Sequence, residues 1–317
     1  MSPTILVVGA TGNTGRSVIH SLPKLLQSSK SLANHRILGL TRSLQNPTAQ
    51  ELSKLPHVEF AEVDWTTIDA AWLREQDVER VYIAPHNQPN QFPEESAFYV
   101  ALLEAGVKYV VRVSTNVKYI CPTSPVYYGR AHWATETLLS QPEFKALQWT
   151  SLRPNFFTRM YLASAAAWVT QYRKTGNAQE VLKTNVAESE AVAMIDPEDV
   201  GSVGSHLVAL DDPSPHNGAK YTLSGPEDLT GKQIVALVEK YAGVDVANVE
   251  FKDVSWIDDL SKSGGYPEKV LFSIRAGCIP LWQGDCSLSG TPTSAEISKL
   301  APPRRTPDDA FKALLEV

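Results

Sequence analysis

The feature that most constrains this chain is the glycine-rich stretch VVGATGNTGR at residues 7–16. It follows the apolar run TILVVG and opens a segment with helical periodicity. Glycine permits a tight turn and lets a bulky anion approach the backbone, while the unpaired N–H groups of a helix N-terminus attract negative charge. The stretch therefore predicts a pyrophosphate-binding loop, and a glycine-rich turn without a ligand is the alternative. The residues assigned to this loop are Gly9, Thr11, Gly12, Asn13, Thr14 and Gly15.

Strand-like and helical segments alternate through the first half of the chain. The strand-like runs are TILVVG, RILGLT, HVEFAEVD, ERVYIAP, KYVVRVST and LQWTSLRP. Nearly continuous apolar strands are typical of a parallel sheet that helices cover on both faces, so we expect a Rossmann-type, doubly wound α/β fold. We assign residues 1–155 to this NAD(P)-binding domain and residues 156–317 to a smaller, mostly helical substrate-binding region. Whether a late strand at 191–196 returns to the first domain is left open.

The end of the second predicted strand indicates which dinucleotide is bound. This strand ends in GLTRS rather than in an acidic residue. An acidic side chain there would repel a 2′-phosphate, whereas Arg42 can pair with one, so NADPH is the expected cofactor. Arg42 as a solvated loop charge is the alternative. Asp64 ends the third strand, where it lies beside the adenine or caps a helix, and Pro85 and Pro154 complete the predicted cofactor-binding set.

Composition and cysteine usage exclude several classes of function. The formal net charge is −6 and no basic run occurs, which argues against binding to nucleic acid or to an acidic membrane. The three cysteines show neither CxxC spacing nor a nearby histidine cluster, so we expect reduced thiols and no metal. The start MSPTILVVGA lacks a basic n-region, and the most apolar helical stretch is too short to span a bilayer. We expect a cytoplasmic monomer or homodimer that acts on a small molecule.

Four stretches together carry a family resemblance: GATGNTGRSVI, GLTRS, VSTNV and LRPNFF. They resemble the NmrA-like branch of the atypical short-chain dehydrogenases/reductases. The resemblance continues more loosely through MIDPEDVGSV and YTLSGPEDLTGKQI. It implies a dinucleotide-binding fold, in a family that contains quinone and isoflavone-type reductases, iminium reductases of alkaloid pathways and regulators that bind the dinucleotide without reducing anything.

The wider superfamily implies a tyrosine and a lysine four residues apart on one helix face. In the matching segment YYGRAHWATE the spacing sets Tyr128 against His132, and the lysine is missing. A tyrosine with the usual pKa of about 10 needs a nearby cation to relay protons well, and a neutral histidine supplies little. Ser114 occupies the place of the hydroxyl partner. We take these three as candidate catalytic residues; the alternatives are a pocket wall, a positioning contact and a backbone-satisfied hydroxyl, respectively.

Aromatic residues outline a candidate substrate pocket. A helical stripe follows the LRP turn, a pattern that is also typical of a protein core; its members are Phe157, Tyr161, Trp168 and Tyr172. If they line a pocket, they favour a large, flat and apolar substrate. The candidate pocket residues are Trp133, Phe156, Phe157, Tyr161, Trp168 and Trp282.

The missing lysine narrows the expected reaction. An iminium ion or a strongly polarised C=C accepts hydride without prior protonation, so loss of the lysine is tolerable there. We therefore expect an NADPH-dependent reductase of a bulky aromatic or alkaloid-like iminium or conjugated C=C in natural-product biosynthesis, with room for cyclisation of the reduced intermediate. The alternatives are a non-catalytic NADP sensor that controls a protein partner and a quinone reductase.

Overall fold

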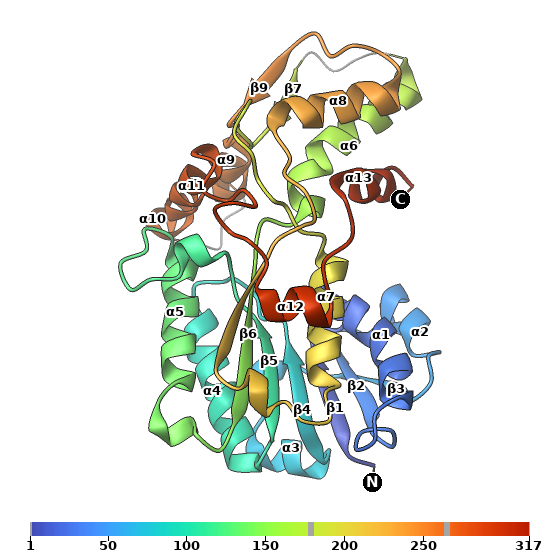
Figure 1. Ribbon diagram of the computed structural model, residues 1–317, viewed down its shortest axis with the longest axis vertical. Helices are drawn as coiled ribbons and strands as arrows, with labels where there is room; N and C mark the ends of the chain where they lie inside the picture. Colours follow the sequence, from blue (N-terminus) through green and yellow to red (C-terminus); the bar gives the residue numbers. More distant parts are fainter. Residues whose placement is uncertain (1, 177–180, 263–266, 317) are drawn as a thin grey trace.

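The computed structural model describes residues 2–176, 181–262 and 267–316, and a seven-stranded sheet forms its lower half (Figure 1). The strand order is β3-β2-β1-β4-β5-β6-β8, and every neighbouring pair runs parallel. The strands are β1 (Thr4–Val8), β2 (Arg36–Thr41), β3 (Val58–Glu62), β4 (Val78–Ile83), β5 (Tyr109–Val113), β6 (Gln148–Pro154) and β8 (Ala219–Leu223). The order reverses direction at β1, so the predicted Rossmann-type fold is confirmed.

Helices cover both faces of this sheet because alternate strand residues point to opposite sides. Ile5 and Val7 of β1 pack under α1 (Gly15–Gln27), α2 (Pro47–Leu52) and α7 (Pro197–Val208). Leu6 and Val8 pack under α3 (Ala70–Glu75), α4 (Gln91–Ala105) and α5 (Tyr127–Leu139). Helices therefore exclude water from both faces of the sheet, which accounts for the nearly continuous apolar runs in the strands.

The strand that returns from the C-terminal half is not at 191–196. That segment is buried but makes only isolated bridges, Phe157 with Ile195 and Val192 with Leu229. The returning strand is β8, which pairs with β6. The apolar run AVAMI signals burial between the two halves of the chain rather than membership of the sheet.

A second, mainly helical body lies above the carboxyl ends of the strands (Figure 1). Its helices are α6 (Thr158–Thr175), α8 (Gly231–Ala242), α9 (Ser255–Lys262), α10 (Glu268–Phe272), α11 (Ile279–Trp282) and α13 (Pro307–Leu315), while α12 (Ala295–Leu300) packs back against α7. β7 (Leu182–Thr184) and β9 (Val249–Phe251) form a small parallel sheet. Short 3-10 turns occupy Trp65–Thr67, Val117–Tyr119, Pro142–Phe144, Ser214–His216 and Ser273–Cys278.

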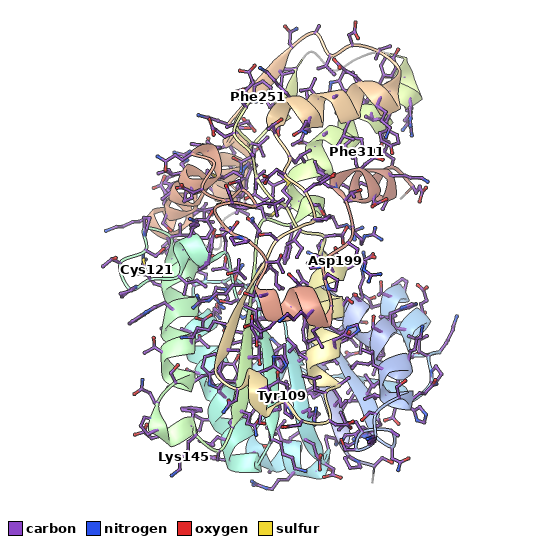
Figure 2. The ribbon with its side chains drawn as sticks, viewed as in Figure 1. Tyr109, Cys121, Lys145, Asp199, Phe251 and Phe311 are labelled. Atoms are coloured by element: carbon purple, nitrogen blue, oxygen red, sulfur yellow. The ribbon has the colours of Figure 1, made fainter. Side chains whose placement is uncertain are left out.

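The upper body has its own hydrophobic core. In Figure 2, Phe311 marks this core, and Tyr109 marks the core between the sheet and the helices α1, α2 and α7. The site described next lies between the two bodies, at the carboxyl ends of the strands. No helix within the described ranges is long and apolar enough to cross a membrane.

Candidate cofactor and substrate site

The glycine loop joins β1 to α1 by a turn that only glycine fits. Gly9 has a φ of +78°, and a Cβ there would lie 2.9 Å from the Ala84 carbonyl oxygen. The Gly12 N–H donates to the Gly9 carbonyl at 2.9 Å, which closes the turn. A Cβ on Gly15 would lie 2.1 Å from the same carbonyl, so Gly15 lets α1 pack directly on the loop. By contrast, a Cβ on Gly12 would approach only Gly9, at 3.1 Å, because Gly12 is exposed toward a cavity.

This cavity of about 640 Å³ lies at the carboxyl ends of β1 to β4. Doubly wound folds bind dinucleotides at this place, where the strand order changes direction. Both the loop and the following strand ends contribute to its wall. The predicted residues that line it are Gly9, Thr11, Gly12, Arg42, Asp64 and Pro85.

Arg42 follows β2 directly and is exposed at this cavity. No hydrogen bond or ion pair joins it to the part of the chain that the structure describes, and it is the only lysine or arginine among the described lining residues. Arg16, the other cation near the loop, pairs instead with Glu198 on α7 at 3.3 Å. Among the described residues, Arg42 is therefore an unpaired cation at the wall of this cavity, a side chain of the kind that binds phosphate groups. Asp64 both lines the cavity and caps the next 3-10 turn, accepting from the Thr66 N–H at 3.0 Å.

Three of the predicted loop residues, Asn13, Thr14 and Gly15, lie outside the lining of this cavity. The Thr14 side chain is buried, and its hydroxyl accepts a hydrogen bond from Tyr82 at 2.8 Å, because the start of α1 turns it toward the sheet. Asn13 is exposed and lies outside the cavity lining.

A second cavity, of about 240 Å³, lies at the ends of β5 and β6 beneath α6. Ser114 and Pro154, at the ends of these strands, line it. A third cavity of about 340 Å³ adjoins it and shares Met160, Tyr161 and Trp256. Aromatic side chains dominate the second cavity, which we call the aromatic cavity: Tyr119, Tyr127, Tyr128, Phe156, Phe157, Tyr161 and Trp256.

Three of the predicted pocket residues lie elsewhere. Trp168 is only 1% exposed and stacks on Tyr172 in the upper core, because its position on α6 faces the neighbouring helices. Trp133 is 37% exposed on the outer side of α5. Trp282 donates its indole N–H to the Asn185 carbonyl at 2.6 Å and stands outside the lining of both aromatic-side cavities.

Tyr128 and His132 share a helix face but not a cavity. Four residues of α-helix rise about 6 Å, which takes His132 below the strand ends while Tyr128 stays above them. His132 is 1% exposed, and its Nδ1 lies 2.9 Å from the Arg112 guanidinium. Burial, with the charges of Arg112 and Arg153, lowers the pKa of His132 well below its usual value. His132 is therefore neutral, and because a guanidinium only donates, its proton is on Nε2.

Tyr128 is a poor proton donor in this setting. Burial, followed by the neighbouring Cys278 and Tyr127, raises its pKa above the ordinary value. No lysine, arginine, histidine or carboxylate occurs among the described residues that line the aromatic cavity. The arrangement therefore lacks the cation that would help this tyrosine to release its proton.

A buried charge cluster beneath the aromatic cavity was missed in the sequence. Arg112 of β5 and Glu95 of α4 are fully buried and pair at 2.8 Å. Glu136 of α5 accepts from Ser114 at 3.0 Å, from Ser151 at 2.7 Å and from Arg153. Burial alone would raise the pKa of Glu136, but hydrogen bonds from Arg153 and the charge of Arg112 outweigh it and lower the pKa. The available signal was an arginine within an otherwise apolar strand, which must find a buried acid.

Two asparagines in the segments that follow β5 and β6 were also missed. Asn116 donates to the Asn155 side-chain oxygen at 2.8 Å, and the Asn155 amide donates to the Cys286 carbonyl at 2.8 Å and to Thr291 at 3.0 Å. These bonds tie the ends of β5 and β6 to residues 286–291. A segment that is remote in the sequence thus holds the ends of the two strands that line the aromatic cavity.

Comparison with known proteins places the chain among dinucleotide-dependent reductases. The NAD(P)H azoreductase of Xenophilus azovorans is 31% identical over 248 residues, 77% of this chain and 76% of that protein. Quinone oxidoreductase 2 of Escherichia coli (strain K12) is 24% identical over 265 residues, 83% of each chain. The triphenylmethane reductase of Citrobacter sp., solved with NADP(H), has the same fold, with a TM-score of 0.70 at 18% identity over 98% of this chain and all of that one. The model of the NmrA-like family matches residues 1–278, so this chain belongs to the NmrA-like family.

Proposed function

We propose that the chain is an NADPH-dependent reductase that passes hydride to a planar, conjugated electrophile held among aromatic side chains. Its curated relatives are an NAD(P)H azoreductase, a quinone oxidoreductase and a third reductase, so reduction is the activity that their names share. The finer part of the proposal is the acceptor, for which we favour a bulky aromatic or alkaloid-like iminium, or a conjugated C=C, of natural-product metabolism.

The cofactor side rests on the loop and on Arg42. The exposed turn at Gly12 lets a pyrophosphate approach the N-terminus of α1, whose first N–H groups attract an anion, and Arg42 offers its charge to a 2′-phosphate. NADPH bound there supplies the hydride. Ser114 and Pro154 line the cavity on the other side of the switch point, where the nicotinamide half of a dinucleotide belongs.

The lining of the aromatic cavity supports this class of acceptor, because no described side chain there supplies a proton readily. A simple ketone needs a proton as hydride arrives, and positioned general acids contribute about 10²- to 10⁴-fold to such steps. An iminium already carries the positive charge, and the faces of aromatic rings attract cations. The raised pKa of Tyr128 therefore supports an acceptor that does not need its proton.

Hydride transfer from NADPH labelled with deuterium at C4 tests the proposal. An aromatic iminium, a conjugated enone, a quinone and a simple aryl ketone are offered in single turnovers, and the product is examined for deuterium. We expect label in the iminium or the enone and none in the ketone. Tight NADPH binding with no label in any acceptor would overturn the reductase and favour the sensor.

A quinone reductase is the second candidate. Its support is the likeness over 83% of the chain to quinone oxidoreductase 2 of E. coli. A quinone also accepts hydride without a strong acid. A kcat/KM for quinones well above that for every iminium and enone would make this candidate the better one.

A further inference from the structure

Two polar side chains face the aromatic cavity from neighbouring strands. Asn87 follows β4 and Ser114 follows β5; these strands pair in parallel, and both residues line the cavity. The residues on either side of Asn87, His86 and Gln88, line the cofactor cavity. Asn87 and Ser114 therefore stand where the two cavities meet.

The Ser114 hydroxyl is held as an acceptor toward the cavity. Its Oγ lies 3.0 Å from Oε1 of Glu136, and an ionised carboxylate only accepts hydrogen bonds. Arg153 and Arg112 keep Glu136 ionised and hold its pKa below the usual range, although burial opposes this. The single hydroxyl proton is thus directed at Glu136, and Ser114 presents lone pairs to the cavity.

The Asn87 amide is held with the opposite polarity. Its Oδ1 lies 3.1 Å from Nε2 of His132, the nitrogen that carries the proton because Nδ1 faces Arg112 at 2.9 Å. The Asn87 backbone carbonyl accepts from the Tyr127 hydroxyl, so α5 holds this residue at two points. Within the described ranges, no residue accepts a hydrogen bond from the amide nitrogen of Asn87. This nitrogen is therefore available as a donor.

We propose that Asn87 and Ser114 form a subsite for a primary carboxamide, Asn87 donating to its carbonyl and Ser114 accepting from its NH₂ group. A primary carboxamide carries one acceptor and one donor group side by side, the complement of this pair. The nicotinamide ring bears such a group, so the inference rests on the proposed use of NADPH. His132 and Glu136 are positioning residues in this arrangement. His132 holds the Asn87 amide with its nitrogen as the donor, and Glu136 holds the Ser114 hydroxyl with its oxygen as the acceptor.

The Ser114 half is tested by equilibrium binding of NADP⁺ and of its 3-acetylpyridine analogue, which keeps the carbonyl and replaces NH₂ by CH₃. We expect the parent to bind NADP⁺ about fivefold more tightly, the value of one net hydrogen bond. Ser114→Ala should bring this ratio to about one, since the acceptor is lost. Ser151→Ala is the matched control, because Ser151 donates to the same Glu136 oxygen but lies outside the cavity lining. A ratio that survives Ser114→Ala, or that is lost equally in Ser151→Ala, overturns the assignment.

The Asn87 half predicts a different pattern. Both ligands keep the carbonyl, so Asn87→Ala should weaken them by the same factor, about fivefold, and leave their ratio unchanged. His132→Phe should reproduce this loss, and the double variant should be no weaker than either single one. His132→Gln should restore binding, because glutamine offers an acceptor to Arg112 and a donor to Asn87. Additive losses, or no rescue by glutamine, contradict the role of His132.

Adenosine 2′,5′-bisphosphate separates this inference from the proposed function. It carries the adenosine half alone, so its affinity should be unchanged in every Asn87, Ser114 and His132 variant. If the parent binds neither this compound nor NADP⁺, the proposed function fails and the subsite with it. If the parent binds NADP⁺ but does not discriminate against the acetylpyridine analogue, only the subsite fails.

Discussion

Replacement of Arg42 should change the cofactor preference of the enzyme. Arg42 is the only lysine or arginine among the described residues of the cofactor cavity, and nothing in the described chain pairs with it. A hydrogen bond between charged groups contributes roughly 1.5–3 kcal/mol. Because Arg42 is exposed, solvent screening favours the lower end of this range, so we expect Arg42→Ala to lower the NADPH/NADH affinity ratio about tenfold.

An acidic replacement should act more strongly than alanine. Glu62, Asp64 and Glu94 line the same cavity, so Arg42→Asp would add a fourth carboxylate to a wall that has then lost its one lysine or arginine among the described residues. We expect the preference to invert toward NADH, since a carboxylate repels the phosphate and accepts from a 2′-hydroxyl.

Fluorescence titration of both dinucleotides measures the NADPH/NADH affinity ratio of each variant. Titrations at about 0.05 and 0.5 M salt identify an ion pair, because screening weakens an exposed ion pair but not a steric preference. Arg16→Ala is the matched control, as Arg16 pairs with Glu198 outside the cavity. An unchanged ratio in Arg42→Asp, or an equal change in Arg16→Ala, would refute the assignment of Arg42.

Three further predictions concern the loop, the tyrosine and the buried histidine. Gly12→Val should abolish NADPH binding, because its side chain enters the cavity, while the fold survives; Gly15→Ala should instead destabilise the protein, since its Cβ would lie 2.1 Å from a carbonyl. Thermal denaturation and dinucleotide titration of both variants check this. Tyr128→Phe should slow reduction of an iminium less than about tenfold, against the 10²- to 10⁴-fold expected of a general acid, as single-turnover rates will show. The free energy of unfolding should fall as pH drops below the ordinary histidine pKa of 6.5, because the unfolded chain binds a proton that buried His132 resists; urea denaturation between about pH 5 and 7 should therefore show a steeper slope in the parent than in His132→Gln.

The fold and the cofactor loop could be predicted because their signals are local. Gly9, Gly12 and Gly15 occupy fixed places in one turn, and Arg42 follows one strand, so neither depends on distant parts of the chain. The walls of the aromatic cavity depend on how α6 is rotated and on which remote segment covers it. Periodicity put Tyr161 and Trp168 in one stripe, although the structure places the first at the cavity and the second in the core.

The polar residues beneath the site were hidden for a related reason. The spacing of Tyr128 and His132 is that of one helix face, but it says nothing about where the sheet ends along that face. Arg112 lies within a strand that otherwise reads as apolar, and its partner Glu95 lies on a preceding helix. Only the assembled fold shows that these charges meet beneath Ser114.

The late return of β8 to the sheet has a consequence for synthesis of the chain. Until residues 197–208 have left the ribosome, α7 cannot cover one face of the sheet, and until residues 219–223 follow, β6 is an open edge with unpaired backbone groups. Such an edge invites pairing with another chain. A fragment that stops at residue 155 should therefore aggregate, and coexpressed residues 156–317 should keep it in solution by supplying the missing strand and helix.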